Sequence, residues 1–238
     1  MGRPVKRIPA PFFAFGGMAF GQGGGKRCFQ PGAWEAWLSA RSLENAAFGR
    51  AEEKMIILIG GESHTGKTFL AQRLLERYSF PYFSLDHLKM GLIRGLADCG
   101  FTAESPDALI SEKMWRIVEG IVVTCVENGQ NLIIEGCYLP PERVRLLLSD
   151  EVVAVYLGLS EAYLSKNFDA LWKYENVVEH RKFPEDRPLE AFIAGNARVR
   201  SACAAWGLSY FEAGETYEKM QKDAIAFLDG KAGLAWRK

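Results

Sequence analysis

The chain lacks several features that assign proteins to large classes at once. Its five cysteines are few, scattered and odd in number, and no two form a C-x-x-C pair, which argues against a disulfide framework or a zinc ribbon. No apolar run reaches the length of about 18 residues that spans a bilayer. The N-terminus has no continuous hydrophobic region followed by a small-residue cleavage site, so we expect no secretory signal. Reduced thiols and a cytoplasmic location are therefore expected.

An excess of charge of either sign is also missing. The 29 basic residues balance the 29 acidic ones, and no basic run is longer than two residues. Neither a nucleic acid nor a membrane surface is therefore expected as the main partner. A chain of 238 residues suits one α/β domain of ordinary size with an extension.

One stretch does match a pattern with a known physical role. The octapeptide Gly61-Glu62-Ser63-His64-Thr65-Gly66-Lys67-Thr68 fits G-x-x-x-x-G-K-[ST], between an apolar run at 55–59 and an amphipathic stretch at 69–75. The glycines let backbone N–H groups surround a phosphate, Lys67 supplies a mobile cation and Thr68 a hydroxyl for Mg²⁺. The pattern predicts binding of a nucleoside triphosphate through Gly61, Glu62, Ser63, His64, Thr65, Gly66, Lys67, Thr68 and Phe69, against the simpler interpretation of a glycine turn between strand and helix.

Residues 1–53 differ in composition from the rest. They contain Pro4, Pro9, Pro11 and Pro31 and a glycine-rich tract at 16–25, so we expect most of this extension to be poorly ordered. Two interpretations stay open: a docking tail for a protein partner, or a dispensable segment, because Met55 directly precedes the first core strand.

The remaining residues, 54–238, alternate short apolar runs with helical patterns. Strands are predicted at 55–59, 82–85, 132–135, 152–157 and 209–212, the second ending at Asp86 and the third at Glu135. A helix that begins with Ser105 as N-cap and Pro106 in the first turn is predicted to bury Ile110, Met114, Ile117, Ile121 and Cys125. A charged segment at about 174–188 is predicted to form a mobile flap. This alternation predicts a doubly wound, five-stranded parallel sheet.

Two acidic residues lie where strands two and three end, on the rim that also carries the phosphate loop. Asp86 is predicted to accept or orient the proton of an attacking hydroxyl; its alternatives are a water-mediated contact to Mg²⁺ and a helix N-cap. Glu135 is predicted to polarise a metal-bound water or to bind acceptor hydroxyls, or else to cap a turn.

The motifs of other phosphate-loop classes are missing. We find no suitably placed D-x-x-G or N-K-x-D of a GTPase, and no room for the lid domain of an assembly ATPase. The chain resembles the small P-loop kinases over about residues 55–228, on the phosphate loop, Ser84-Leu85-Asp86, Ile133-Ile134-Glu135-Gly136-x-x-x-Pro140 and a basic flap. This group includes nucleoside monophosphate, shikimate and gluconate kinases, chloramphenicol phosphotransferase, 2-phosphoglycerate kinase and zeta-toxin kinases.

Within that group the motifs point in different directions. The segment that ends at Pro140 is most similar to 2-phosphoglycerate kinase, whereas Asp86 before a short helix resembles zeta-toxin and chloramphenicol phosphotransferase sites. The Asp-Gly-aromatic-Pro-Arg of nucleoside monophosphate kinases is replaced by a sequence without the arginine. This departure from the pattern argues against an AMP-like acceptor.

Several arginines are candidates for phosphate or carboxylate recognition. Arg181 in the flap is predicted to reach the terminal phosphate, with Lys182 and Arg187 as substitutes. Arg94 and Arg143 are predicted to bind the acceptor together with Asp86 and Glu135.

The sequence thus predicts a kinase in which ATP, with Mg²⁺, donates its γ-phosphate to a hydroxyl of a small polar metabolite, with Lys67, Asp86, Arg181 and Glu135 as catalytic residues. Two alternatives stay open: a zeta-toxin-like kinase of nucleotide sugars, and a nucleotide-binding regulatory module without transfer activity.

Overall fold

The fold is organised around one fully buried strand, β1 (Ile56–Gly61). In the computed structural model, which describes residues 54–174, 187–214 and 216–231, β1 pairs in parallel with β3 (Leu132–Glu135) on one side and β4 (Val152–Leu159) on the other. The outer strands, also parallel, are β2 (Tyr82–Ser84) and β5 (Ser209–Ala213). The five strands lie in the order β2-β3-β1-β4-β5, so the predicted five-stranded parallel sheet is confirmed.

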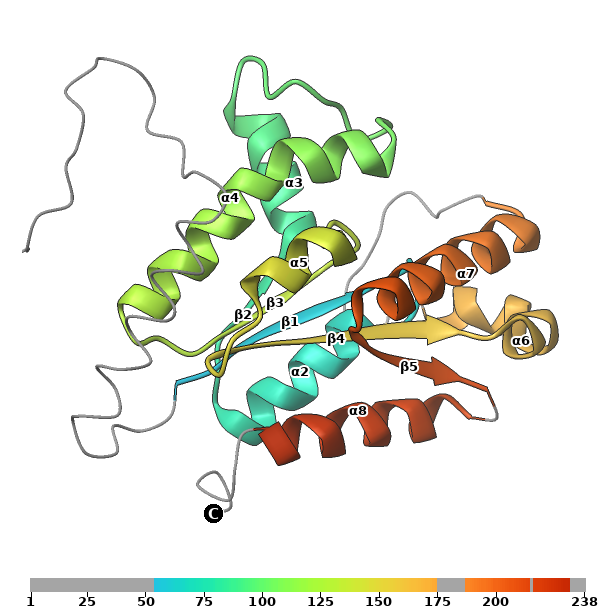
Figure 1. Cartoon of the computed structure of the whole chain (residues 1–238). Helices are drawn as coiled ribbons and strands as arrows, with labels where there is room; N and C mark the ends of the chain where they lie inside the picture. Colours follow the sequence, from blue (N-terminus) through green and yellow to red (C-terminus); the bar gives the residue numbers. More distant parts are fainter. Residues whose placement is uncertain (1–53, 175–186, 215, 232–238) are drawn as a thin grey trace, which may run out of the picture. The chain divides into compact units, whose positions relative to one another are not determined.

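Helices cover both faces of this sheet (Figure 1). Helices α2 and α8 lie together on one face, and α4, α5 and α7 lie on the opposite face. The helices have the following bounds: α2 (Lys67–Tyr78), α3 (Leu85–Gly95), α4 (Asp107–Glu127), α5 (Pro141–Leu147), α6 (Glu161–Tyr174), α7 (Leu189–Trp206) and α8 (Tyr217–Lys231).

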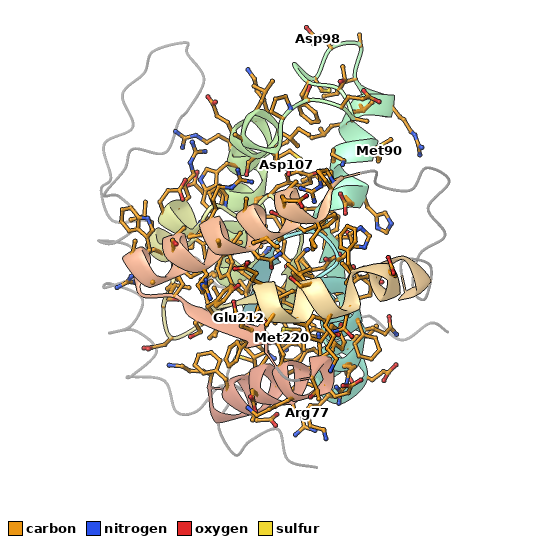
Figure 2. All side chains as sticks on the ribbon, turned by 90° about the vertical axis from the view of Figure 1, so that its right-hand side faces the viewer. Arg77, Met90, Asp98, Asp107, Glu212 and Met220 are labelled. Carbon is orange, nitrogen blue, oxygen red and sulfur yellow. The ribbon has the colours of Figure 1, made fainter. Side chains whose placement is uncertain are left out.

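The core lies where these layers meet the sheet. The residues of β1 from Ile56 to Ile59 are at most 1% exposed, as expected of a central parallel strand covered on both faces. Figure 2 shows the side chains on this framework, with Met220 of α8 in the interior and Arg77 of α2 at the surface. Burial of this apolar surface is the main term that stabilises the sheet and so fixes the strand ends that carry the site.

Two details of the sequence interpretation are wrong. Ser105 is not the N-cap of α4: Pro106 occupies that position, and the Ser105 hydroxyl accepts a hydrogen bond from the backbone N–H of Thr102 at 2.9 Å. Ile117 is not a core residue, because its side chain is 37% exposed while Trp115, Val118 and Val122 are buried. Apolar residues occur on two faces of α4. The helical spacing of apolar residues therefore could not tell which of them lie on the buried face, and it included Ile117 wrongly.

Three of the sequence predictions lie wholly or partly outside the described residues: the extension at 1–53, most of the flap, and Arg181 within it. Among the described residues, no helix is long and apolar enough to cross a membrane.

Candidate active site

The phosphate loop lies between the end of β1 and the start of α2, where the sequence predicts it. The side chain of Lys67 is folded back over the loop, and its Nζ donates a hydrogen bond to the backbone carbonyl of Glu62 at 2.7 Å. The hydroxyl of Thr65 donates to the same carbonyl at 2.8 Å. The loop therefore holds its own shape through internal hydrogen bonds, and Lys67 is only 7% exposed.

Helix α8 packs against the phosphate loop. Gly66 has φ 81°, and a β-carbon at this position would overlap the hydroxyl of Tyr217 at the start of α8. One turn later, Gln221 donates from Nε2 to the carbonyl of Gly66 at 3.3 Å and to the Tyr217 hydroxyl at 3.0 Å. Because Gly66 has no side chain, α8 packs directly against the loop backbone and fixes its position.

Both predicted carboxylates lie at the same end of the sheet as Lys67. Glu135, the last residue of β3, is 2% exposed and pairs in register with Ile59 of β1 and Ser84 of β2. The strand β2 ends at Ser84, one residue earlier than predicted, so Asp86 lies in the first turn of α3. Burial opposes the charge on Lys67, but Cys137, which carries a charge only at high pH, and the carboxylates of Glu135 and Asp86 outweigh this, so the pKa of Lys67 lies above its ordinary value. Lys67 is therefore a fixed cation at neutral pH.

A cysteine also lies beside the loop. The Sγ of Cys137 is 3.8 Å from the hydroxyl of Ser63. Burial raises the pKa of the Cys137 thiol, and the nearby charge of Lys67 offsets this only in part. The thiol is therefore protonated at neutral pH and acts as a neutral neighbour of the site.

A second lysine, which the sequence interpretation missed, lies next to Asp86. The Nζ of Lys89 is 3.4 Å from the Asp86 carboxylate and donates a hydrogen bond to the hydroxyl of Tyr138 at 2.8 Å. The same amine lies 5.2 Å from the centre of the Tyr138 ring. Its position three residues after Asp86, one helical turn away, is the signal that could have identified it.

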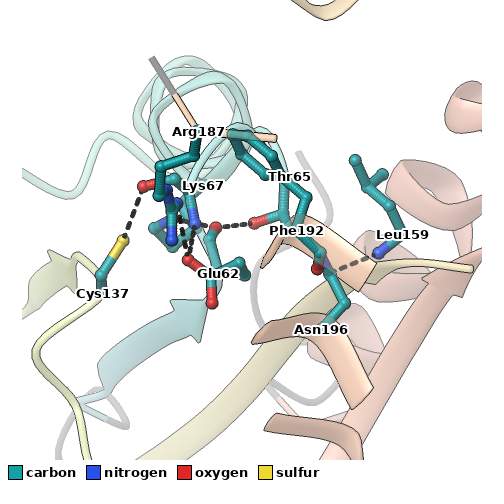
Figure 3. Close-up of polar contacts among 9 residues, drawn as sticks. Glu62, Thr65, Lys67, Cys137, Leu159, Arg187, Phe192 and Asn196 are labelled. Atoms are coloured by element: carbon teal, nitrogen blue, oxygen red, sulfur yellow. Dashed lines mark hydrogen bonds and ion pairs between the residues drawn. The ribbon is translucent and has the colours of Figure 1, made fainter. Parts of the chain in front are cut away.

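On the other side of the loop, Glu62 is paired with Arg187 (Figure 3). The Nη2 of Arg187 donates to Oε1 of Glu62 at 3.0 Å, and the guanidinium lies 4.5 Å from the centre of the Phe192 ring in α7. Arg187, named in the sequence only as a substitute for Arg181, is thus placed at the phosphate loop.

The other residues predicted for the site have separate surroundings. His64 has φ 59°, and its ring packs edge-on against Phe192 at 5.7 Å between centres, while Thr68 is half-buried in the first turn of α2. Phe69 is 39% exposed and lies between Arg73 and Tyr217. Arg94 is exposed in the last turn of α3, and Arg143 lies over the Trp115 ring at 5.9 Å.

No protein-family model and no curated protein sequence matches the chain. Solved structures do resemble it. A shikimate kinase from Acinetobacter baumannii in complex with shikimate is 14% identical, with 76% of this chain and 96% of that chain covered and a TM-score of 0.50. A shikimate kinase from Bacteroides thetaiotaomicron (15% identity, 73% and 98%, TM-score 0.48) and a sugar kinase from Janibacter sp. (15%, 78% and 99%, 0.45) are also similar.

At this level of identity the likeness shows the fold. The doubly wound, five-stranded parallel sheet predicted from the sequence is thus a fold that this chain shares with the shikimate kinase from Acinetobacter baumannii.

Proposed function

We propose that the protein is an ATP-dependent phosphotransferase that moves the γ-phosphate of ATP to a hydroxyl of a small polar metabolite. One observation carries the proposal: the phosphate-loop cation Lys67, the carboxylate of Glu135 at the end of β3 and that of Asp86 just after β2 lie at the same end of the sheet, and both carboxylates raise the pKa of Lys67. A protein that only binds a nucleotide does not require acidic side chains at both positions. A phosphotransferase requires a cation for the donor and an acid for the acceptor hydroxyl.

In this proposal each residue has a separate task. The loop amides and Lys67 bind the phosphates, and Asp86 orients the acceptor hydroxyl and takes its proton as the O–P bond forms. Lys89 and Tyr138 lie on the acceptor side, next to Asp86. The hydroxyl of Thr68 and the carboxylate of Glu135 are oxygen ligands of the kind that Mg²⁺ prefers, so these residues fit the ion. When bound, Mg²⁺ neutralises part of the phosphate charge.

The test is transfer of label from γ-labelled ATP. The full chain is incubated with Mg²⁺ and pools of glycerate phosphates, sugars, nucleosides, nucleotides and nucleotide sugars, and labelled products are separated. We expect label in one pool, loss of transfer in Lys67→Ala, and a roughly 100-fold or greater loss in Asp86→Asn with ATP binding retained. Lys219→Ala, which removes an exposed lysine paired with Asp223 at 2.9 Å, is the matched control and should behave as wild type.

The alternatives correspond to different outcomes of the same experiment. Label in the nucleotide-sugar pool would support a zeta-toxin-like kinase. Tight ATP binding with label found only in ATP or free phosphate would support a regulatory module, and the search would move to partners of residues 1–53. Wild-type transfer by Asp86→Asn would remove Asp86 from its proposed role.

A further inference from the structure

Glu62 is an unusual residue to find inside a phosphate loop. The site must attract a polyanion, yet this position carries a carboxylate that is 8% exposed. A buried carboxylate is unfavourable unless it is paired and hydrogen-bonded. Its Oε1 accepts a hydrogen bond from the backbone N–H of Ser63 at 3.0 Å and an ion-paired hydrogen bond from Arg187 at 3.0 Å.

Arg187 is held from a second direction as well. Its guanidinium stacks on Phe192 at 4.5 Å, and Phe192 is itself fully buried between His64 of the loop and Phe168 of α6. Two contacts at different sides of a planar group fix both its position and its orientation. The Arg187 side chain is 28% exposed, so it is held at the border of the site rather than enclosed.

Helix α7 is shaped to admit the carboxylate. A β-carbon at Gly195 would collide with Oε2 of Glu62, so only glycine leaves room for the acid at this point. The next residue, Asn196, anchors the helix to the sheet, because its Oδ1 accepts the backbone N–H of Leu159 at 2.8 Å. The carboxylate therefore lies against a rigid part of the fold.

The consequence is that two cations are held by one residue of the loop. Lys67 is bound to the backbone carbonyl of Glu62, and Arg187 is bound to its side chain (Figure 3). Lys67 of this motif reaches the β- and γ-phosphates of a bound nucleotide. Arg187 therefore shares its loop residue with the lysine that this motif uses to reach the phosphates, the group where charge develops during phosphoryl transfer.

We propose that Glu62 is a positioning residue that holds Arg187 in place to contact the terminal phosphate of the bound nucleoside triphosphate. This inference rests on the proposed function only in that the site binds ATP. A net contribution to stability does not account for the arrangement, because buried ion pairs contribute little stability relative to apolar residues of the same size.

The test compares two nucleotides that differ in the terminal phosphate. Calorimetry on the full chain gives the affinities for the non-hydrolysable ATP analogue AMP-PNP and for ADP, both with Mg²⁺, and needs no acceptor. In Arg187→Ala the preference for AMP-PNP over ADP should fall by about tenfold or more, the size of one charge-assisted hydrogen bond. Arg187→Lys should recover only part, since it keeps the charge but loses the planar fork. Arg200→Ala is the control, because this exposed arginine of the same helix pairs with Glu212 outside the site.

Two further variants test the positioning itself. Glu62→Gln keeps the size of the side chain but removes its charge, and Gly195→Ala keeps both charged residues while its methyl group displaces the carboxylate. Both should lower the preference for AMP-PNP while leaving ADP binding nearly unchanged. Alanine also favours a helix interior over glycine, so Gly195→Ala stays informative if the charge variants fail to fold.

The outcomes separate this inference from the proposed function. If wild type bound neither nucleotide, the proposed function would be wrong and the inference with it. If wild type preferred AMP-PNP and the preference were unchanged in Arg187→Ala and Gly195→Ala, the inference alone would be overturned. A parallel loss of affinity for both nucleotides, with a lower melting temperature, would assign the pair a purely structural role.

Discussion

The two lysines of the site differ in the groups that surround their amines. The amine of Lys67 lies on a backbone carbonyl of the loop, and its side chain is almost fully buried. The amine of Lys89 lies between the Asp86 carboxylate and the Tyr138 hydroxyl, and its side chain is 15% exposed. In the proposed function the first binds the donor and the second lies beside the acceptor, so their substitutions should affect different substrates.

We therefore predict that Lys89→Met raises the KM for the acceptor about tenfold, the loss of one contact worth about 1.4 kcal/mol, while the KM for ATP stays within about twofold. Methionine retains the length and the contact with the Tyr138 ring but removes the charge. Steady-state kinetics with the acceptor found by label transfer, varying each substrate in turn, measures both constants. Lys222→Met, on the exposed side of α8, is the control. An unchanged acceptor KM would place Lys89 outside the acceptor contacts.

How far the site could be predicted depends on how its residues are spaced in the chain. The phosphate loop and the acids at the strand ends form local patterns, and the rule that parallel strand ends share one rim brought them together correctly. The pair of Glu62 and Arg187 spans 125 residues, so no local pattern could reveal it. Contacts between distant segments are set by the packing of whole helices on the sheet.

At the scale of elements, α7 contributes Phe192 and Gly195 to one side of the site, and one of its buried side chains, Asn196, bonds the helix to the sheet. Asn196 is 3% exposed, accepts the backbone N–H of Leu159 and donates to the carbonyl of Phe192 at 2.9 Å. Pro188 and Gly207 flank α7 as its N-cap and C-cap and are local signals in the sequence, whereas the contact of Asn196 with β4 has no local signal. Boundary residues act locally, but the partner of a buried amide depends on the fold.

We predict that Asn196→Ala lowers the free energy of unfolding by about 1–3 kcal/mol, because the N–H of Leu159 loses its acceptor inside the protein. The same change should weaken the preference for AMP-PNP over ADP, since Phe192 and Gly195 lose their fixed position. Urea unfolding followed by circular dichroism measures the first effect. Ser201→Ala is the matched control on the same helix, because its exposed hydroxyl donates only to the carbonyl of Ala197. Equal stability of the two variants would contradict the anchoring role.

At the scale of the whole molecule, several buried or half-buried groups ionise only at high pH. Burial raises the pKa of the Cys203 thiol, which is fully buried, from 9.0 to about 12. Burial also raises the pKa of four tyrosines: Tyr78, Tyr156, Tyr210 and Tyr217. Each of these groups stays protonated in the folded state at a pH where it has already lost its proton in the unfolded chain.

The sign of the pH dependence follows from this difference. Below about pH 9 both states hold these protons, so the groups add no pH dependence to stability. Above the ordinary pKa of each group, 9.0 for the thiol and 10.0 for the tyrosines, the unfolded state binds fewer protons than the native state. Each such group then lowers the free energy of unfolding by about 1.4 kcal/mol per pH unit.

We therefore predict that these groups cause no change in the urea midpoint of unfolding between pH 7.5 and 8.5. Above about pH 9.5 they should make the midpoint fall steeply. The absorbance of tyrosinate near 295 nm provides an independent readout. In the native protein part of the tyrosine signal should appear only as the chain unfolds, in a step that coincides with loss of circular dichroism, whereas in urea all tyrosines should titrate near pH 10. A smooth native titration centred near pH 10 without loss of structure would show that these side chains are open to solvent, and the packing of the core described above would have to be revised.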